Sequence, residues 1–363
     1  MRPPFLAALT AVMLWIPCPS QAQGKPTAKS KSSPRQYSQL AVVETIKIES
    51  EPAEAFIAEE PLRCDADGNF YLRVQVNVEP AIRKFNAEGM QEALFRPTSI
   101  SDLNVDRASY FSVRGDGGID QLVFPSKSED SYVVTFKSDG TYKSKTRLQP
   151  GFRFRPYQLA TFPSGEWLVT GVRNDDDPKI HVKWPFTGIF SEEGTLLKQV
   201  VLKDDEQIHK MAAAGDPEVV PKGHRYGNTA IEQGAAAAAE NGNAYVMRRF
   251  SAATIYAISP SGEVVRRFRI DPGNVGFHPL SMQVAGNRMA VLFFKSNTQD
   301  VISPEDVILK VVDLEGHQQT TYHHVGTSNM GIDLVCYSPL RERFTFLTIT
   351  NDHFLGFTLA EPR

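Results

Sequence analysis

Short apolar runs separated by turn-forming residues dominate the chain from Gln36 to its end. The runs at 70–76, 167–172 and 289–294 are rich in Val, Phe and Leu, and the segments between such runs carry Gly, Asn, Asp and Ser. This alternation of short strands and turns is typical of a sandwich, a barrel or a propeller. Helical periodicity is nearly absent, so the pattern predicts an all-β fold.

One hairpin pattern recurs along the chain. An apolar residue opens and a glycine closes each of the segments 85–89, 136–140, 190–194, 258–262 and 312–316. Glycine suits a tight hairpin because its backbone adopts positive φ without steric cost. A second turn and another apolar strand lie upstream of each hairpin, so each unit consists of four expected strands. The second unit matches poorly, because its first turn is assigned to 106–109, where no glycine occurs.

The two ends of the domain complement each other. A sixth unit begins at Ile332 and the chain ends after its third strand, while residues 39–49 form an expected strand that belongs to no unit. Pairing that strand with the last unit would close a ring and remove the open sheet edge. We therefore expect a single domain over residues 36–363. Ala235–Ala239 favours a helix by propensity, but its register places it on the innermost strand of the fourth unit, and a strand is predicted.

These repeats resemble those of six-bladed β-propellers of the NHL-repeat or TolB-like type. The residues that carry the resemblance are an Asp-x-x-Gly-Asn turn at 65–69 before an apolar strand, and the hairpins that end in glycine. The resemblance covers about residues 36–363 and implies four-stranded blades, with the N-terminal strand completing the last blade. Related six-bladed lactonases and lyases hold Ca²⁺ at the mouth of the central channel, but this sequence offers no complete set of matching ligands. The resemblance thus implies a fold and not an activity.

The N-terminus has the features of a secretory signal peptide. Arg2 precedes an apolar run from Phe5 to Ile16, and small residues at Ser20 and Ala22 place cleavage after Ala22. Residues 23–35 are polar and are expected to form a disordered leader. These features predict export to the periplasm or the extracellular space.

Charge and composition narrow the classes of partner. The 363 residues include 41% hydrophobic and 22% charged residues and have a formal net charge of -3. Such a charge does not attract nucleic acid, and no later segment has the roughly 20 apolar residues of a membrane span. We expect a monomer that binds an unknown protein, peptide or small-molecule ligand.

Polar residues at the start of each innermost strand form the first candidate site. They would converge at the mouth of a central channel, which is a common place for a ligand. The alternative is that they only line a water-filled channel. The residues are Glu60, Asp102, Tyr157, Gln158, His278 and Asp333.

Two long loops form the second candidate site. Residues 174–186 and 203–234 should lie on the same face of the domain, where loops can vary on a rigid scaffold. They could form a recognition patch, a metal site or a solvated acidic surface, and no pair has the spacing of a zinc site. The candidate residues are Asp175, Asp177, His181, Trp184, His209 and His224.

Two cysteines and the search for catalytic motifs complete the sequence analysis of candidate chemical groups. Cys64 and Cys336 fall at corresponding positions of the first and last units, and we expect two buried thiols, with a disulfide as the alternative. No common catalytic motif occurs. The sequence therefore favours an exported binding module without a cofactor. The alternative is a Ca²⁺-dependent hydrolase, lactonase or lyase with its site at the channel mouth.

Overall fold

The computed structural model describes residues 38–48, 57–76, 79–173, 183–216, 229–295, 306–324, 333–349 and 355–363. The chain divides into two units, Met1–Gln36 and Tyr37–Arg363. The first unit, with the predicted signal peptide and leader, lies outside the described residues. The described part of the second unit is built almost entirely of β-strands, as the apolar runs predict.

Four sheets contain four strands each. Within each sheet the strands follow one another in the chain, and all neighbouring pairs are antiparallel. The strands are β2 (Ile57–Cys64), β3 (Phe70–Val76), β4 (Glu79–Phe85), β5 (Gln91–Phe95); β6 (Val105–Val113), β7 (Ile119–Pro125), β8 (Tyr132–Phe136), β9 (Tyr142–Arg147); β10 (Phe154–Thr161), β11 (Trp167–Arg173), β12 (Trp184–Phe190), β13 (Leu196–Gln199); β14 (Ala235–Ala238), β15 (Ala244–Arg249), β16 (Ala253–Ile258) and β17 (Val264–Ile270).

A fifth sheet contains eight strands in the order β18-β19-β20-β21-β1-β24-β23-β22. The N-terminal strand β1 pairs antiparallel with the C-terminal strand β24, and its first three residues pair parallel with β21. The strands are β18 (Phe277–Ala285), β19 (Arg288–Lys295), β20 (Val307–Asp313), β21 (Gln318–His324), β22 (Asp333–Ser338), β23 (Arg343–Ile349), β24 (Leu355–Pro362) and β1 (Ser38–Lys47).

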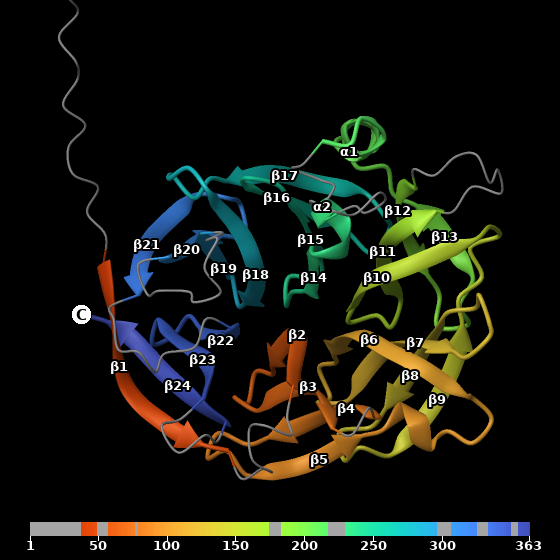
Figure 1. Cartoon of the computed structure of the whole chain (residues 1–363), viewed down its shortest axis with the longest axis horizontal. Coiled ribbons are helices and arrows are strands. Elements are labelled where there is room, and N and C mark those ends of the chain that lie inside the picture. The colour runs from red at the N-terminus through yellow and green to blue at the C-terminus, as the bar shows by residue number, and fades with distance from the viewer. Residues whose placement is uncertain are drawn as a thin grey trace, which may run out of the picture. The chain divides into compact units, whose positions relative to one another are not determined.

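The sheets of this unit surround a common centre, which gives a β-propeller arrangement (Figure 1). The first strand of each four-stranded sheet and the two end strands of the eight-stranded sheet, β18 and β22, lie nearest the centre, and neighbouring strands of this set contact one another. Buried apolar clusters fill the space between neighbouring sheets. Leu122 and Val133 of one sheet, for example, pack with Leu159 and Val169 of the next. The core is therefore a series of layers between blades, and it leaves the centre free for polar groups.

The recurring glycines have the backbone conformation that the hairpins require. The glycines that close the five hairpins have φ between +75° and +90°. At Gly194 an added Cβ would also lie 2.0 Å from the carbonyl oxygen of Arg147 on the neighbouring sheet, so a side chain has no room. The prediction for the second unit was wrong, because residues 106–109 belong to strand β6. The first turn of that unit is 114–118, and it does contain a glycine with positive φ, Gly117.

The insertion between the third and fourth units contains short helices that the sequence pattern did not reveal. Helix α1 (Asp205–Ala213) carries two acidic residues in its first turn, where they complement the helix dipole, and it buries Ile208. Helix α2 (Thr229–Glu232) is a single turn, and the 3₁₀ turn η2 (Pro97–Ser99) follows β5. Residues Ala235–Ala238 form β14, so the predicted strand there is confirmed. Among the described residues, no helix has the length and apolar character needed to cross a membrane.

Cys64 and Cys336 form a disulfide, so the expectation of two buried thiols was wrong. Cys64 ends β2 and Cys336 lies in β22, the innermost strands of neighbouring sheets. Innermost strands converge toward the centre, and the two Cα atoms are 5.4 Å apart, within the range that a disulfide spans. The bond links segments that are 272 residues apart in the sequence.

Candidate ligand-binding site

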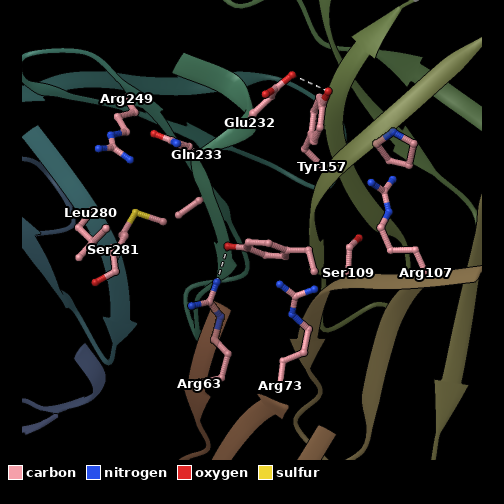
Figure 2. Close-up of a pocket in the computed structure, with 15 residues that line it drawn as sticks. Arg63, Arg73, Arg107, Ser109, Tyr157, Glu232, Gln233, Arg249, Leu280 and Ser281 are labelled. Atoms are coloured by element: carbon pink, nitrogen blue, oxygen red, sulfur yellow. Dashed lines mark hydrogen bonds between the residues drawn. The ribbon is translucent and has the colours of Figure 1, made fainter. Parts of the chain in front are cut away.

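A cavity of about 470 Å³ lies at the centre of the propeller unit. Its volume is within the range typical of small-molecule sites, about 300–1,000 Å³. All five sheets contribute to its walls, together with the end of α2 and the segment that follows it (Figure 2). The side chains used below are Arg63, Arg73, Arg107, Ser109, Tyr110, Tyr157, Glu232, Arg249, Leu280 and Met282.

A hydrogen-bonded group fixes one wall of the cavity. The hydroxyl of Tyr110 accepts a bond from the backbone N–H of Ala236 at 2.8 Å and donates to its carbonyl oxygen at 3.0 Å. The guanidinium of Arg63 donates to the Tyr110 hydroxyl and, at 3.1 Å, to the same carbonyl. Three different sheets are joined here, so Arg63 is a structural residue with its donors already engaged.

Positive charge dominates the cavity lining. Among the described lining residues, four are arginines and a single one, Glu232, carries a carboxylate. That carboxylate accepts a hydrogen bond from the Tyr157 hydroxyl at 2.7 Å. Burial and this bond raise the pKa of Tyr157, so the tyrosine remains a neutral donor. The one carboxylate among the described lining residues is therefore already engaged by Tyr157.

Two further cations add to the positive charge, Arg155 near Arg107 and Lys183 near Arg155. The Arg107 guanidinium lies over the ring of Phe124, 4.4 Å from its centroid, and Arg155 lies over the ring of Tyr157. Burial and then the nearby Arg155 lower the pKa of Arg107, and the same two causes lower the pKa of Lys183. Cations that disfavour one another's charge in this way attract an anion and repel a cation.

Arg249 faces the cavity from the opposite side, at the end of β15 (Figure 2). Its guanidinium lies over the ring of Phe294, 5.5 Å from the centroid. Burial lowers its pKa to about 10. Among the described residues, Arg249 has no hydrogen-bond acceptor and no carboxylate partner, which is unusual for a half-buried charge.

The predicted channel-mouth residues do not converge as a group. Tyr157 lines the cavity, and Gln158 is buried beside it, where its amide donates to the carbonyl of Ile231 at 2.6 Å and so holds α2. Asp102 is exposed and pairs with Lys145 on the outermost strand β9, well away from the cavity lining. His278 in β18 and Asp333 at the start of β22 lie outside the lining, and burial raises the pKa of Asp333. Glu60 is in β2, and its side chain lies outside the described part of the structure.

The two loops predicted to lie together, 174–186 and 203–234, are in contact through one described pair of aromatic side chains. The rings of Trp184, at the start of β12, and His209, in α1, are stacked with centroids 3.5 Å apart. The other candidates, Asp175, Asp177, His181 and His224, lie outside the described residues. Within the described ranges, no three His, Cys, Asp or Glu side chains are grouped so that they could hold a metal ion.

The arginines of the cavity were missed by sequence reasoning. Arg73 and Arg249 lie in the second strands of their units among apolar residues, and Arg107 lies near the start of β6. Charged residues are rarely buried without a partner, so an arginine within a predicted inner strand is itself a signal. Applied to the second strand of each unit, that signal would have indicated Arg249.

Comparisons with known proteins add little beyond this geometry. No family model and no curated protein matches the sequence. Among solved structures, the chain is similar to a Bacteroides caccae protein of unknown function, at 13% identity and a TM-score of 0.44, covering 74% of this chain and 82% of that one. It is also similar to Kuenenia stuttgartiensis hydrazine synthase, at 11% identity and a TM-score of 0.42, covering 79% and 75%. A prolyl endopeptidase is similar at 11% identity and a TM-score of 0.41, covering 86% of this chain and 51%, about half, of its own length. Ligand and activity are therefore inferred from the cavity itself.

Proposed function

We propose that this protein is an exported, monomeric six-bladed β-propeller of the NHL-like or TolB-like type that binds a negatively charged ligand in its central cavity. The eight-stranded sheet counts as two blades in this proposal, and β1 completes the last one. The innermost strands support that count, because their contacts run in a circle through β2, β6, β10, β14, β18 and β22 and back to β2. Residues 1–22 would direct the export and would be cleaved off during it.

The excess of arginine in the cavity carries the functional proposal. Arg73, Arg107 and Arg249 line one cavity from three different sheets. Arginine presents several N–H donors in a planar arrangement that matches a carboxylate or phosphate. A rigid scaffold that holds several guanidinium groups around a ligand-sized cavity is suited to capture an anion.

The alternative of a Ca²⁺-dependent hydrolase, lactonase or lyase has less support at this site. Ca²⁺ needs six to eight oxygen ligands, usually including several carboxylates. The cavity presents arginines, which repel a cation, and its Glu232 is hydrogen-bonded to Tyr157. The described cavity thus favours an anionic ligand over a bound cation.

Thermal melts of residues 23–363 with sodium phosphate, citrate, benzoate or calcium chloride, at constant ionic strength, test this proposal. We expect at least one anion to raise the melting temperature, because a ligand that binds only the folded state stabilises it, and we expect Ca²⁺ to leave it unchanged. Arg107→Gln should weaken binding of the most effective anion about tenfold or more, since a charge-assisted contact contributes about 1.5–3 kcal/mol.

Arg269→Gln is the matched control. Arg269 lies exposed on β17, at the outer edge of its blade, and its replacement removes the same charge without touching the cavity. Affinity in that variant should equal that of the wild type. If none of these anions stabilises the wild type at 10 mM, about 100 times a Kd of about 0.1 mM, the anion site in the cavity is contradicted. Equal loss of affinity in Arg107→Gln and Arg269→Gln would contradict it as well.

A further inference from the structure

We infer that the ligand is a carboxylate attached to an apolar carbon body, and that Arg249 is the residue that selects it. This inference rests on the proposed function and narrows the class of anion. It depends on which side chains line the two sides of the cavity: one side carries Arg249 and Leu280, and the other carries Arg107 and Ser109.

Arg249 has nothing within the described structure to balance its charge. Transfer of a charged group from water into a protein is unfavourable unless the group is paired, and burial accordingly lowers the pKa of Arg249. The ring of Phe294 gives only a cation–π contact, at 5.5 Å. An anion in the cavity would supply the missing partner, and its carboxylate could accept two parallel N–H bonds from the guanidinium.

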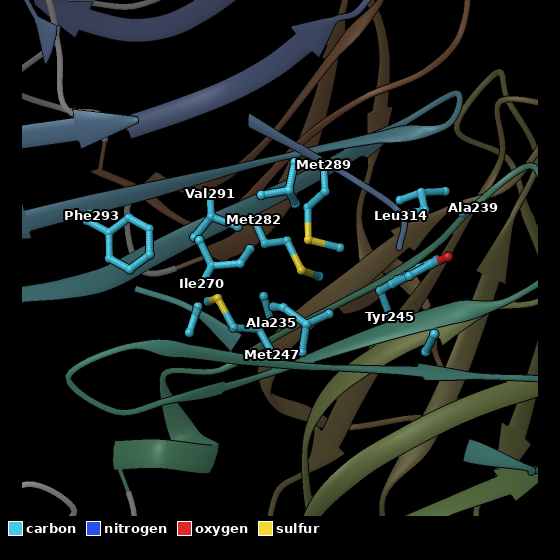
Figure 3. Packing of buried hydrophobic residues seen from close by; sticks show 14 of the residues in the cluster. Ala235, Ala239, Tyr245, Met247, Ile270, Met282, Met289, Val291, Phe293 and Leu314 are labelled. Atoms are coloured by element: carbon cyan, nitrogen blue, oxygen red, sulfur yellow. The ribbon is translucent and has the colours of Figure 1, made fainter. Parts of the chain in front are cut away.

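The side of the cavity that carries Arg249 combines the polar side chains of Gln233 and Ser281 with apolar ones. Figure 2 places Arg249 on the same side of the cavity as Leu280, with Arg107 and Ser109 on the opposite side. Met282 also lines the cavity, and it belongs to the buried apolar cluster between the sheet of β14–β17 and the strands β18–β20 (Figure 3). The charge of Arg249 is thus presented next to a wall of Leu and Met side chains.

This combination distinguishes between kinds of anion. A phosphate or sulfate ion would neutralise Arg249 but would leave the partly exposed side chain of Leu280 uncovered. A carboxylate on an aliphatic or aromatic body can pair with Arg249 and cover the apolar wall at the same time. Arg107, which lies beside Ser109 on the opposite side of the cavity, remains able to bind inorganic anions. Arg249 and its neighbours therefore favour an organic acid.

Calorimetric titration of residues 23–363 with three probes tests the inference. Benzoate combines charge and an apolar body, benzamide has the same shape without the charge, and inorganic phosphate has charge without the body. We expect benzoate to bind at least tenfold more tightly than either of the others, which corresponds to about 1.4 kcal/mol.

Two substitutions separate the charge from the apolar wall. Arg249→Gln should lower benzoate affinity at least tenfold and leave the melting temperature of the free protein equal or higher, because it removes a desolvated charge without a partner. Leu280→Ala should lower benzoate affinity several-fold and leave phosphate binding unchanged. Arg269→Gln should alter neither. An unchanged or raised melting temperature of Arg249→Gln also shows that the variant folds.

The outcomes distinguish this inference from the proposed function. If phosphate binds as tightly as benzoate, or if Arg249→Gln binds benzoate like the wild type, the inference is wrong and the cavity is a general anion site. Benzamide binding as tight as that of benzoate would also overturn the role of Arg249. If none of the anions binds, the proposed function fails together with the inference.

Discussion

Replacing Cys64 and Cys336 together with alanine should lower the free energy of unfolding by about 2–5 kcal/mol. The disulfide ties β2 to β22 and closes a loop of 272 residues, so its loss greatly increases the conformational freedom of the unfolded chain. The two residues also belong to the apolar cluster between these sheets. Urea unfolding followed by tryptophan fluorescence measures the change, with the transition midpoint and slope determined for each variant.

Reduction of the wild type provides an independent check of this first prediction. A reducing agent should shift the wild-type transition toward that of the double variant and leave the double variant itself unchanged. Mass spectrometry of the oxidised protein should find no alkylated thiol at either position. Two freely alkylated cysteines, or a transition that is insensitive to reduction, would show that this bond does not hold the two sheets together.

Replacing Asp120 with alanine should destabilise the protein by about 3–5 kcal/mol, as expected for a buried charged hydrogen-bond network that loses its central member. Asp120 is fully buried in β7. Its carboxylate accepts bonds from the Thr135 hydroxyl at 2.6 Å, the Thr161 hydroxyl at 2.8 Å and the Trp167 indole N–H at 3.0 Å. Thr161 and Trp167 belong to the next sheet, so the variant would leave buried donors unsatisfied between two blades.

Asp106→Ala is the control for this second prediction, because Asp106 is exposed in the same sheet. Its effect should stay within about 0.5 kcal/mol, the usual range for surface positions. The same urea measurement serves both variants. Equal stability of Asp120→Ala and Asp106→Ala would mean that the three donors find water or other acceptors, and that the network does not join the blades.

Features of the fold that depend on local backbone chemistry could be predicted from the sequence. The hairpin glycines, such as Gly89 and Gly194, mark turns that need positive φ, and the apolar runs between them mark strands. The turn of the second unit was misplaced because the segment 106–109 combines turn-forming residues with a position inside a long strand. The helix α1 was missed because nine residues with a single buried apolar side chain, Ile208, give almost no periodic signal.

Features that depend on how the blades converge could not be predicted in the same way. The pairing of Cys64 with Cys336 follows from the close approach of innermost strands, which spacing along the chain does not measure. The candidate site raises the same problem. Both Tyr157 and Asp102 were expected at the channel mouth. Tyr157 lines the cavity, but Asp102 pairs with Lys145, in a contact between two outer segments that the sequence pattern does not indicate. Arg249 is a candidate ligand-binding residue because no acceptor or carboxylate among the described residues pairs with it, and that can be seen only in the three-dimensional structure.

A crystal structure with bound 4-bromobenzoate would test the central claim most directly. Crystals grown without sulfate, phosphate or carboxylate buffers would be soaked with the compound, and the anomalous signal of bromine would locate it. We predict a bromine peak inside the arginine-lined cavity beside Leu280 and Met282, with the carboxylate against the Arg249 guanidinium. Bromine peaks confined to other surfaces, with the cavity holding only water in crystals that reach saturating ligand, would contradict it.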